Sequence, residues 1–209
     1  MLASCRLRYS GIVRTPVPTG TSSSFPAKSS GTDDSASFTH FAASSLFSPH
    51  TTESTSFHIG KIKQMGIQLI WQTGESYYKQ NEMALSMIQT DEIKIMPFIR
   101  NMNDAYGVAD FIISRAGALA IAELGIVAAP TILVPFPYAA EDHQTKNALA
   151  LVDKGAAILV KDSEVSFALI PAFTELFNDS RKCEEMAEAM KQFAQPDAVA
   201  KIVENIMSL

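Results

Sequence analysis

The sequence predicts a doubly wound α/β fold, in which helices cover both faces of a parallel β-sheet. Short apolar runs such as Ile67–Trp71 and Phe111–Ser114 are almost uninterrupted, as expected for strands buried on both faces. These runs alternate along the chain with segments of helical length and pattern, which is typical of strand–helix–strand units. Together the two observations predict a sheet of the Rossmann type.

The predicted elements follow one another in a regular order from about residue 58. Each predicted strand is short, apolar and closed by a turn or a polar loop: Ile67–Trp71, Ile93–Pro97, Phe111–Ser114, Thr131–Val134 and Ala157–Val160. Helices are predicted at about Tyr77–Ile88, Asn103–Ala109, Gly117–Val127, Asp142–Lys154, Ser163–Asn178, Ser180–Ala194 and Asp197–Ser208. Ligands of such sheets lie beyond the carboxyl ends of the strands, so functional residues are expected directly after each strand.

The composition indicates a folded core and excludes several classes of function. The 209 residues are 47% hydrophobic and 19% charged, the balance of a globular protein. A net charge of −5 gives no electrostatic reason to bind nucleic acid. Cys5, Cys183 and the four histidines fit no metal-ligand spacing and no disulfide framework, so we expect neither a metal nor another cofactor. The longest nearly apolar run, Val127–Tyr138, is too short to span a bilayer, which leaves only peripheral membrane contact.

The first 57 residues differ in composition from the rest of the chain. They contain 14 Ser and 8 Thr, whereas residues 58–209 contain 7 and 5. One interpretation is a disordered segment, because so little apolar surface cannot offset the entropy of ordering. Another is an organellar transit peptide, since residues 1–32 carry Arg6, Arg8, Arg14 and Lys28 but no acid. A third is a segment that is not native to the domain, produced by a shifted reading frame or a gene fusion. We therefore divide the chain into residues 1–57 and an α/β domain of residues 58–209.

Two features after the third predicted strand suit an anionic ligand with a diol. The turn Ser114–Leu119 is built of small residues around Gly117, which would let a helix N-terminus approach an anion closely; a plain strand-to-helix turn is the alternative. Glu123 follows on an otherwise apolar helix. Its carboxylate either points to solvent or accepts hydrogen bonds from a ligand diol such as a ribose.

Polar and apolar residues follow two other predicted strands. After Thr131–Val134, Asp142 is a candidate helix cap, which leaves His143, Gln144 and Asn147 as hydrogen-bonding groups suited to sugar hydroxyls and amides. The same stretch is also consistent with a capped helix that has a polar first turn. His143 is in addition a candidate general base, although no partner nucleophile is visible in the sequence.

An apolar lip follows the second predicted strand. Phe98, Ile99 and Met102 could pack on a planar base, or they could belong to the ordinary core.

Several separated motifs in register resemble the carboxy-terminal, nucleotide-sugar-binding domain of the MurG family of N-acetylglucosaminyltransferases. The motifs are Met96–Met102, Ala109-Asp110, Ser114–Leu119 with Glu123, Pro130, Val134-Pro135 and Glu141–Ala148, within about residues 59–208. The resemblance implies one half of a GT-B glycosyltransferase fold. It also implies the reaction of peptidoglycan synthesis that converts lipid I to lipid II with UDP-N-acetylglucosamine as donor, at the cytoplasmic face of the inner membrane.

The resemblance assigns expected roles to the residues of these motifs. Phe98, Ile99 and Met102 would flank uracil, and Glu123 would bind the ribose hydroxyls. The residues that would shape the turn near the diphosphate are Arg115, Ala116, Gly117, Ala118 and Leu119. The residues that would hold or surround the N-acetylglucosamine are Gln144, His143, Thr145 and Asn147. The family's inverting transfer implies no metal in the donor site.

The chain also departs from the family pattern. Nothing in the sequence corresponds to the amino-terminal domain that binds the lipid acceptor, and the family's first strand with its glycine-rich phosphate loop is not recognisable before His58. Three hypotheses remain: a truncated member of the family, the soluble donor-binding subunit of a split glycosyltransferase, or a UDP-sugar-binding module without catalysis. In each of them UDP-N-acetylglucosamine is the expected partner, and lipid I binds only if the amino-terminal domain is supplied.

Overall fold

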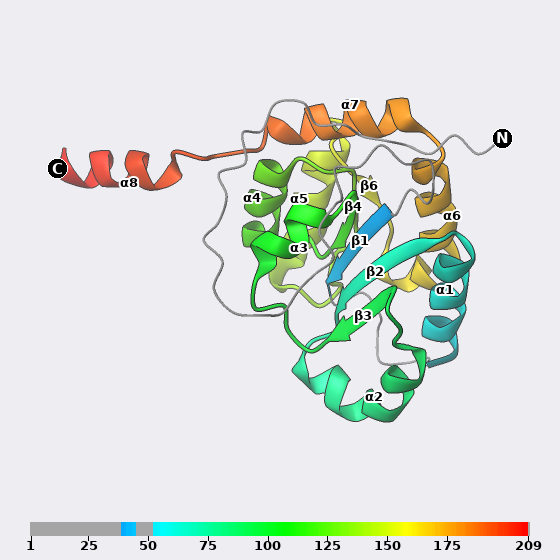
Figure 1. Cartoon of the computed structure of the whole chain (residues 1–209). Helices are drawn as coiled ribbons and strands as arrows, with labels where there is room; N and C mark the ends of the chain where they lie inside the picture. The colour runs from blue at the N-terminus through cyan, green and yellow to red at the C-terminus, as the bar shows by residue number, and fades with distance from the viewer. Residues whose placement is uncertain (1–38, 45–51, 209) are drawn as a thin grey trace, which may run out of the picture.

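The computed structural model describes residues 39–44 and 52–208. Within these residues, six parallel strands form one sheet in the order β3-β2-β1-β4-β5-β6 (Figure 1). The strands are β1 (Thr39–Ser44), β2 (Ile67–Gln72), β3 (Ile93–Met96), β4 (Phe111–Ser114), β5 (Thr131–Leu133) and β6 (Ile158–Leu159). The strand order reverses between β1 and β4, so the predicted doubly wound fold is confirmed.

The helices described in these residues match those that the sequence predicts from Tyr77 onward, with small displacements at their ends. They are α1 (Thr52–Gln64), α2 (Glu75–Ile88), α3 (Met102–Val108), α4 (Ala118–Val127), α5 (His143–Val152), α6 (Val165–Phe177), α7 (Ser180–Lys191) and α8 (Ala198–Met207). Two short 3-10 turns, η1 (Ala140–Asp142) and η2 (Asp162–Glu164), follow β5 and β6.

The sheet is covered on both faces, which explains why its strands are apolar throughout. On one face, Trp71 and Phe111 belong to a core with residues of α1, α2 and α6. On the other face, Ile112 and Leu133 pack with α4 and α5, while Ile70 packs with α3. Helix α7 contributes Met186 to the first core and Met190 to the second, and it runs across one end of the sheet (Figure 1).

One predicted boundary is wrong. Composition led us to expect no packed structure before residue 58, yet β1 lies in the centre of the sheet and α1 begins at Thr52. In the ladder Thr39 is opposite Ile67 of β2, and Phe41 is opposite Phe111 of β4. A central parallel strand is hydrogen-bonded to a neighbour on each side. A segment with as little apolar character as THFAAS can therefore form a strand there. The strand was not predicted because Ser and Thr residues flank it and dominate the composition of this part of the chain. The expectations for residues 1–38 and 45–51 lie outside the described residues.

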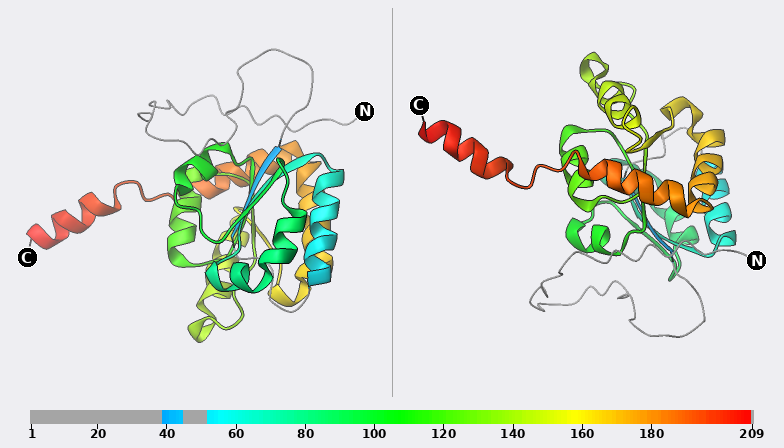
Figure 2. Two further views of the ribbon diagram at one scale, coloured as in Figure 1. Left: turned by 60° about the horizontal axis from the view of Figure 1, so that its bottom comes forward. Right: turned by 90° about the horizontal axis from the view of Figure 1, so that it is seen from above.

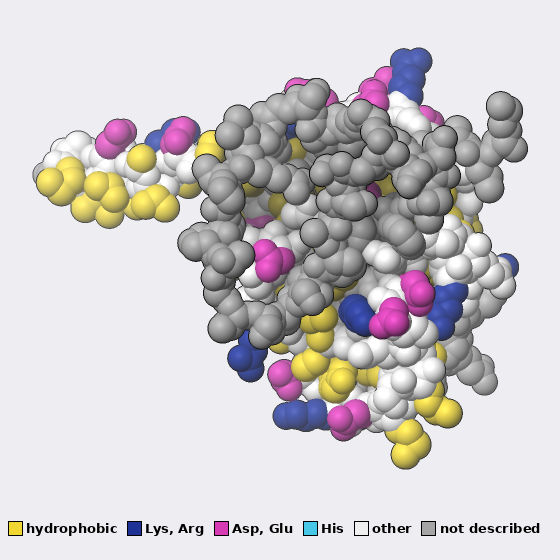
Figure 3. All heavy atoms as spheres, in the orientation of Figure 1, with side chains coloured by type: hydrophobic (Ala, Val, Ile, Leu, Met, Phe, Trp, Pro, Cys, Tyr) yellow, Lys and Arg dark blue, Asp and Glu magenta, His cyan; other side chains and the backbone are white. Residues whose placement is uncertain are grey.

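Helix α8 stands away from the rest of the molecule (Figures 1 and 2). No residue of α8 is buried, and its hydrophobic side chains gather along one side of the helix in the surface view (Figure 3). These exposed residues recur at helical spacing: Val199, Ile202, Val203, Ile206 and Met207. Among the described residues, no helix is both long and apolar enough to cross a membrane.

Candidate functional site

The candidate site lies where the strand order reverses, at the carboxyl ends of β1 and β4. There Arg115, Ala116 and Gly117 connect β4 to α4, and Gly117 occupies the N-cap position without a side-chain cap. A Cβ placed on Gly117 would meet no described atom within 4 Å. Within the described part of the chain, the first turn of α4 thus has no side-chain cap and no side chain or backbone close to Gly117. Unpaired amides and the helix dipole make such a terminus attractive to an anion.

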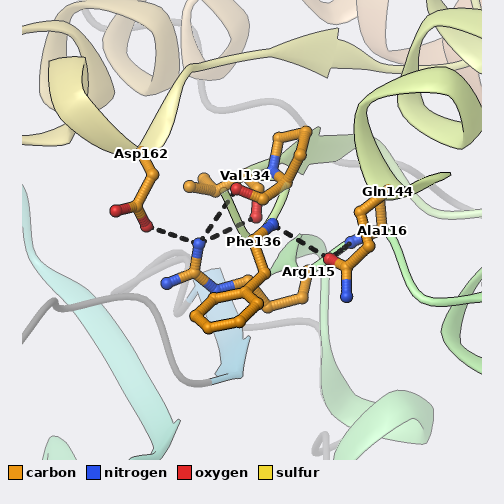
Figure 4. Close-up of polar contacts among 7 residues, drawn as sticks. Arg115, Ala116, Val134, Phe136, Gln144 and Asp162 are labelled. Carbon is orange, nitrogen blue, oxygen red and sulfur yellow. Dashed lines mark hydrogen bonds and ion pairs between the residues drawn. The ribbon is translucent and has the colours of Figure 1, made fainter. Parts of the chain in front are cut away.

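The side chain of Arg115 joins three loops of this edge (Figure 4). Its Nη1 atom donates hydrogen bonds to the carbonyl oxygens of Val134 and Pro135, each at 3.2 Å, and pairs with Oδ1 of Asp162 at 2.5 Å. The guanidinium carbon also lies 5.6 Å from the ring centroid of Phe136. Both charged side chains are largely buried, with 17% and 16% of their surface exposed. Arg115 thus braces the loops after β4, β5 and β6, with its guanidinium directed at Asp162.

Helix α5 holds the turn before α4 through two amide side chains. Oε1 of Gln144 accepts hydrogen bonds from the backbone N–H of Ala116 at 3.2 Å and of Phe136 at 3.0 Å (Figure 4). Nδ2 of Asn147 donates to the carbonyl of Ala116 at 3.1 Å. The amide nitrogen of Gln144 has no partner among the described residues, so it remains available as a donor. These contacts bring the predicted residues Gln144 and Asn147 next to the α4 N-terminus.

Glu123 lies on the exposed side of α4 and has a partner that the sequence did not reveal. The hydroxyl of Tyr106 in α3 donates a hydrogen bond of 2.9 Å to its Oε2 atom. Burial of the phenol, together with this bond to a carboxylate, raises the pKa of Tyr106 well above its usual range. The phenol is therefore protonated at neutral pH and acts as a donor to Glu123.

The structure exposes the three residues of the predicted apolar lip to very different extents. Phe98 is 61% exposed, whereas Ile99 is only 4% exposed and packs with Ile70. Met102 is half-buried against the same cluster. The N–H of Ile99 donates to Oε1 of Gln72 at 2.8 Å, which fastens this loop to the end of β2. Phe98 is thus the residue of the three that offers exposed surface.

The start of α5 differs from its predicted arrangement. Asp142 was expected to cap the helix, but it adopts a left-handed conformation (φ 55°) and makes no side-chain cap bond. The preceding residue, Glu141, is also left-handed, because the chain turns sharply between η1 and α5. Nδ1 of His143 lies 2.6 Å from the carbonyl oxygen of Ala140, a contact that requires a proton on Nδ1. His143 is exposed and Thr145 is half-buried.

The remaining predicted residues of the turn are distributed around the α4 N-terminus. Ala116 is fully buried, whereas Ala118 and Leu119 are exposed, Leu119 at 83%. Among the described residues, no three His, Cys, Asp or Glu side chains lie close enough to hold a metal ion.

Sequence reasoning missed three residues of this region: Tyr106, Gln72 and Asp162. Gln72 ends β2, and Asp162 follows Val160 by two positions at the end of β6. The rule that functional residues follow the strands therefore pointed to both. Tyr106 lies within α3, one helical turn after Met102, and the same helix face is the signal that links the two.

The parallel sheet, its reversal between β1 and β4, and the uncapped helix that begins there define a Rossmann-like α/β domain, the class whose ligands lie at the switch point. The chain belongs to the family described as glycosyltransferase family 28 C-terminal domain, whose model matches residues 39–202. The resemblance inferred from the motifs is thereby confirmed. The match begins at β1, earlier than the expected start near His58.

Curated relatives include the UDP-N-acetylglucosamine–N-acetylmuramyl-(pentapeptide) pyrophosphoryl-undecaprenol N-acetylglucosamine transferase of Cytophaga hutchinsonii. The chain is 44% identical to it over 152 residues, which are 73% of this chain and 40% of the relative. The enzyme of the same name from Bacteroides thetaiotaomicron is 44% identical over 144 residues, covering 68% of this chain and 39% of the relative. The chain therefore spans about two fifths of the length of these relatives.

Solved structures agree on the fold. MurG of Acinetobacter baumannii superposes with a TM-score of 0.66 at 29% identity, covering 82% of this chain and 52% of that one. The complex of Staphylococcus aureus MnaA with UDP superposes with a TM-score of 0.58 at 15% identity, covering 81% and 45%, which indicates a shared fold alone.

Proposed function

We propose that this chain binds UDP-N-acetylglucosamine and forms the donor half of an N-acetylglucosaminyltransferase acting on lipid I. The observation that carries the proposal is the uncapped N-terminus of α4 at the switch point, with Glu123 less than two turns further along the same helix. The names of the curated relatives support the choice of donor and acceptor. The reaction would place the chain in peptidoglycan synthesis, as a peripheral protein at the cytoplasmic face of the membrane that holds the acceptor.

The proposed roles are those that the family resemblance implies, and the positions of the residues around the α4 N-terminus support them. Phe98 would stack on the uracil ring beside Ile99 and Met102, and Glu123 would accept hydrogen bonds from the ribose. The amides of Gly117, Ala118 and Leu119 would meet the diphosphate. Gln144 would donate its amide to the N-acetylglucosamine, with His143, Thr145 and Asn147 nearby, and Arg115 and Ala116 would keep the turn in place.

The chemistry of the donor site would be electrostatic. When the bond from the sugar to the diphosphate breaks, negative charge accumulates on the leaving diphosphate. Amides that already point at this position stabilise the charge without reorganising, which is where preorganised donors contribute most. Gln144 supports this arrangement because its carbonyl fixes the backbone of Ala116, directly before the helix.

A substitution at Gly117 tests the proposal because it separates binding from stability. Gly117 has an extended conformation (φ −69°, ψ 150°), and no atom of the described residues lies within 4 Å of the position that a Cβ would take, so Asp fits there without strain. In Gly117→Asp the carboxylate would cap α4 and stabilise the fold by roughly 0.2–0.5 kcal/mol. The same carboxylate would occupy the amides and repel the diphosphate. We expect a higher melting temperature and at least a tenfold loss of UDP affinity, measured by calorimetric titration.

Gly117→Ala is the matched control, since it fills the same space without a charge. It should retain UDP binding within about threefold. Full UDP affinity in a stably folded Gly117→Asp variant would show that the α4 N-terminus is not the diphosphate site.

A second candidate function is suggested by the exposed apolar side of α8, which is typical of an interface. The chain would then be the donor-binding subunit of a split glycosyltransferase, or else a UDP-sugar-binding module. Co-purification with a separate acceptor-binding protein would favour the split enzyme. UDP-sugar binding without transfer in the presence of that protein would favour the binding module.

A further inference from the structure

The bond between Tyr106 and Glu123 joins two parts of the candidate site that are separate in the chain. Tyr106 lies on α3, which begins at Met102 beside the apolar lip, and Glu123 lies on α4, which begins at the open N-terminus. Their side chains meet at 2.9 Å between Oη and Oε2. Met102 and Tyr106 are four residues apart on one helix and so share a face. The tyrosine therefore links the region expected to receive a base to the carboxylate expected to receive a ribose.

The two partners differ in how firmly they are held. The ring of Tyr106 packs against the core cluster that contains Ile112 and Leu124. Glu123 is exposed, and a free glutamate side chain at a surface samples several rotamers. A bond from a packed phenol to one carboxylate oxygen removes much of that freedom before a ligand binds. The other oxygen, Oε1, has no partner among the described residues and can accept a ligand hydroxyl.

We propose that Tyr106 is a positioning residue of the ribose subsite, which orients Glu123 so that its free oxygen receives the sugar hydroxyls. The inference rests on the proposed function and deepens it. The phenol would contact Glu123 and not the nucleotide. Its contribution would consequently appear for ligands that carry ribose hydroxyls and disappear for ligands that lack them.

The experiment compares UDP with 2′,3′-dideoxyuridine diphosphate in calorimetric titrations of the full chain. In Tyr106→Phe we expect UDP affinity to fall about 5–20-fold, while affinity for the dideoxy ligand changes less than twofold. Glu123→Gln removes the negative charge of the group that accepts the hydrogen bond from Tyr106. It should likewise lower the affinity for UDP but not that for the dideoxy ligand. In the double variant the loss should be smaller than the product of the two single losses, because both act through one interaction.

Tyr78→Phe is the matched control. Tyr78 is also half-buried, but it packs against the core on the other face of the sheet. The Tyr78→Phe protein should therefore bind both ligands with the affinity of the wild type. Melting temperatures of all variants establish that they are folded.

The possible outcomes separate the inference from the function on which it rests. A wild-type chain that binds no UDP would overturn the proposed function and the inference together. UDP binding that is unchanged in Tyr106→Phe would overturn the positioning role alone. An equal loss for UDP and the dideoxy ligand would do the same, because it would reveal a general structural effect. If Tyr106→Phe does not fold, Tyr106→Met, which fills a similar space without a hydroxyl, is compared with the two ligands in the same way.

Discussion

At the scale of single residues, the buried charge of Arg115 is compensated by groups of the protein and hardly by solvent. Its guanidinium and the carboxylate of Asp162 are both more than four-fifths buried, and two backbone carbonyls share the same nitrogen. Removing one partner of such a pair leaves the other charge buried without compensation. Arg115→Ala should therefore lower the free energy of unfolding by about 2–4 kcal/mol, as measured by urea denaturation.

The pair of Arg181 and Glu185 on α7 provides a control for this prediction. It has the same charges, but its side chains are 88% and 63% exposed. Arg181→Ala should change stability by less than about 0.5 kcal/mol, because solvent screens the pair. If the two arginine variants had the same stability, the brace across the three loops would contribute nothing measurable.

The same residues show what the sequence could reveal about the site. Gln144 and Asn147 could be proposed from sequence because they follow a predicted strand, and Glu123 because it is a carboxylate on an otherwise apolar helix. Their partners were not recognisable. Tyr106 is 17 residues from Glu123, and Asp162 is 47 residues from Arg115, so only the folded chain brings them together. Sequence proximity likewise grouped Phe98 with Ile99, whereas the fold buries one and exposes the other.

At the scale of elements, the close approach of α4 to the chain after α7 depends on one glycine. A Cβ on Gly125 would lie 2.8 Å from the backbone of Phe193 and Ala194, and backbone atoms cannot move aside easily. Gly125→Ala should therefore destabilise the fold by about 1–3 kcal/mol, the range for overpacked cores. Thermal unfolding followed by circular dichroism measures the change.

Gly60 supplies the opposite case within a helix. It lies in α1, where a Cβ would meet nothing within 4 Å. Gly60→Ala should raise stability by about 0.5–1 kcal/mol, since alanine restricts the unfolded chain and favours the helix. Stabilisation by both substitutions would contradict the packing of α4 described above.

The elements also show why most of the fold, but not all of it, follows from the sequence. The strands from β2 to β6 are apolar because both faces are covered, and this produces the runs from which they were predicted. Strand β1 lacks such a run, since Phe41 is its one large apolar residue. It is a strand because β2 and β4 hold it on both sides, a tertiary cause that no local pattern records.

At the scale of the whole molecule, helix α8 has the character of an interface. The apolar side of α8 covers no part of the described body. The family model that matches the chain is that of a C-terminal domain, and the matched region makes up about two fifths of the relatives' length. A helix with five exposed apolar residues is typical of an interface. We therefore expect α8 to pack against a partner surface, in keeping with the proposed role of the chain as the donor half of the enzyme.

This view leads to the prediction that the chain, assayed alone, does not transfer N-acetylglucosamine to lipid I. Inverting transfer requires an acceptor hydroxyl held in line with the anomeric carbon and a base that accepts its proton. His143 donates from Nδ1 to the carbonyl of Ala140, which leaves Nε2 able to accept a proton, but the resemblance places this residue beside the sugar and not at the acceptor. In a radiolabelled transfer assay we expect turnover only after a separately expressed amino-terminal half of a relative is added. Loss of that turnover in Glu123→Ala would tie it to this donor site. Turnover by the chain alone would instead require an acceptor site within its own 209 residues.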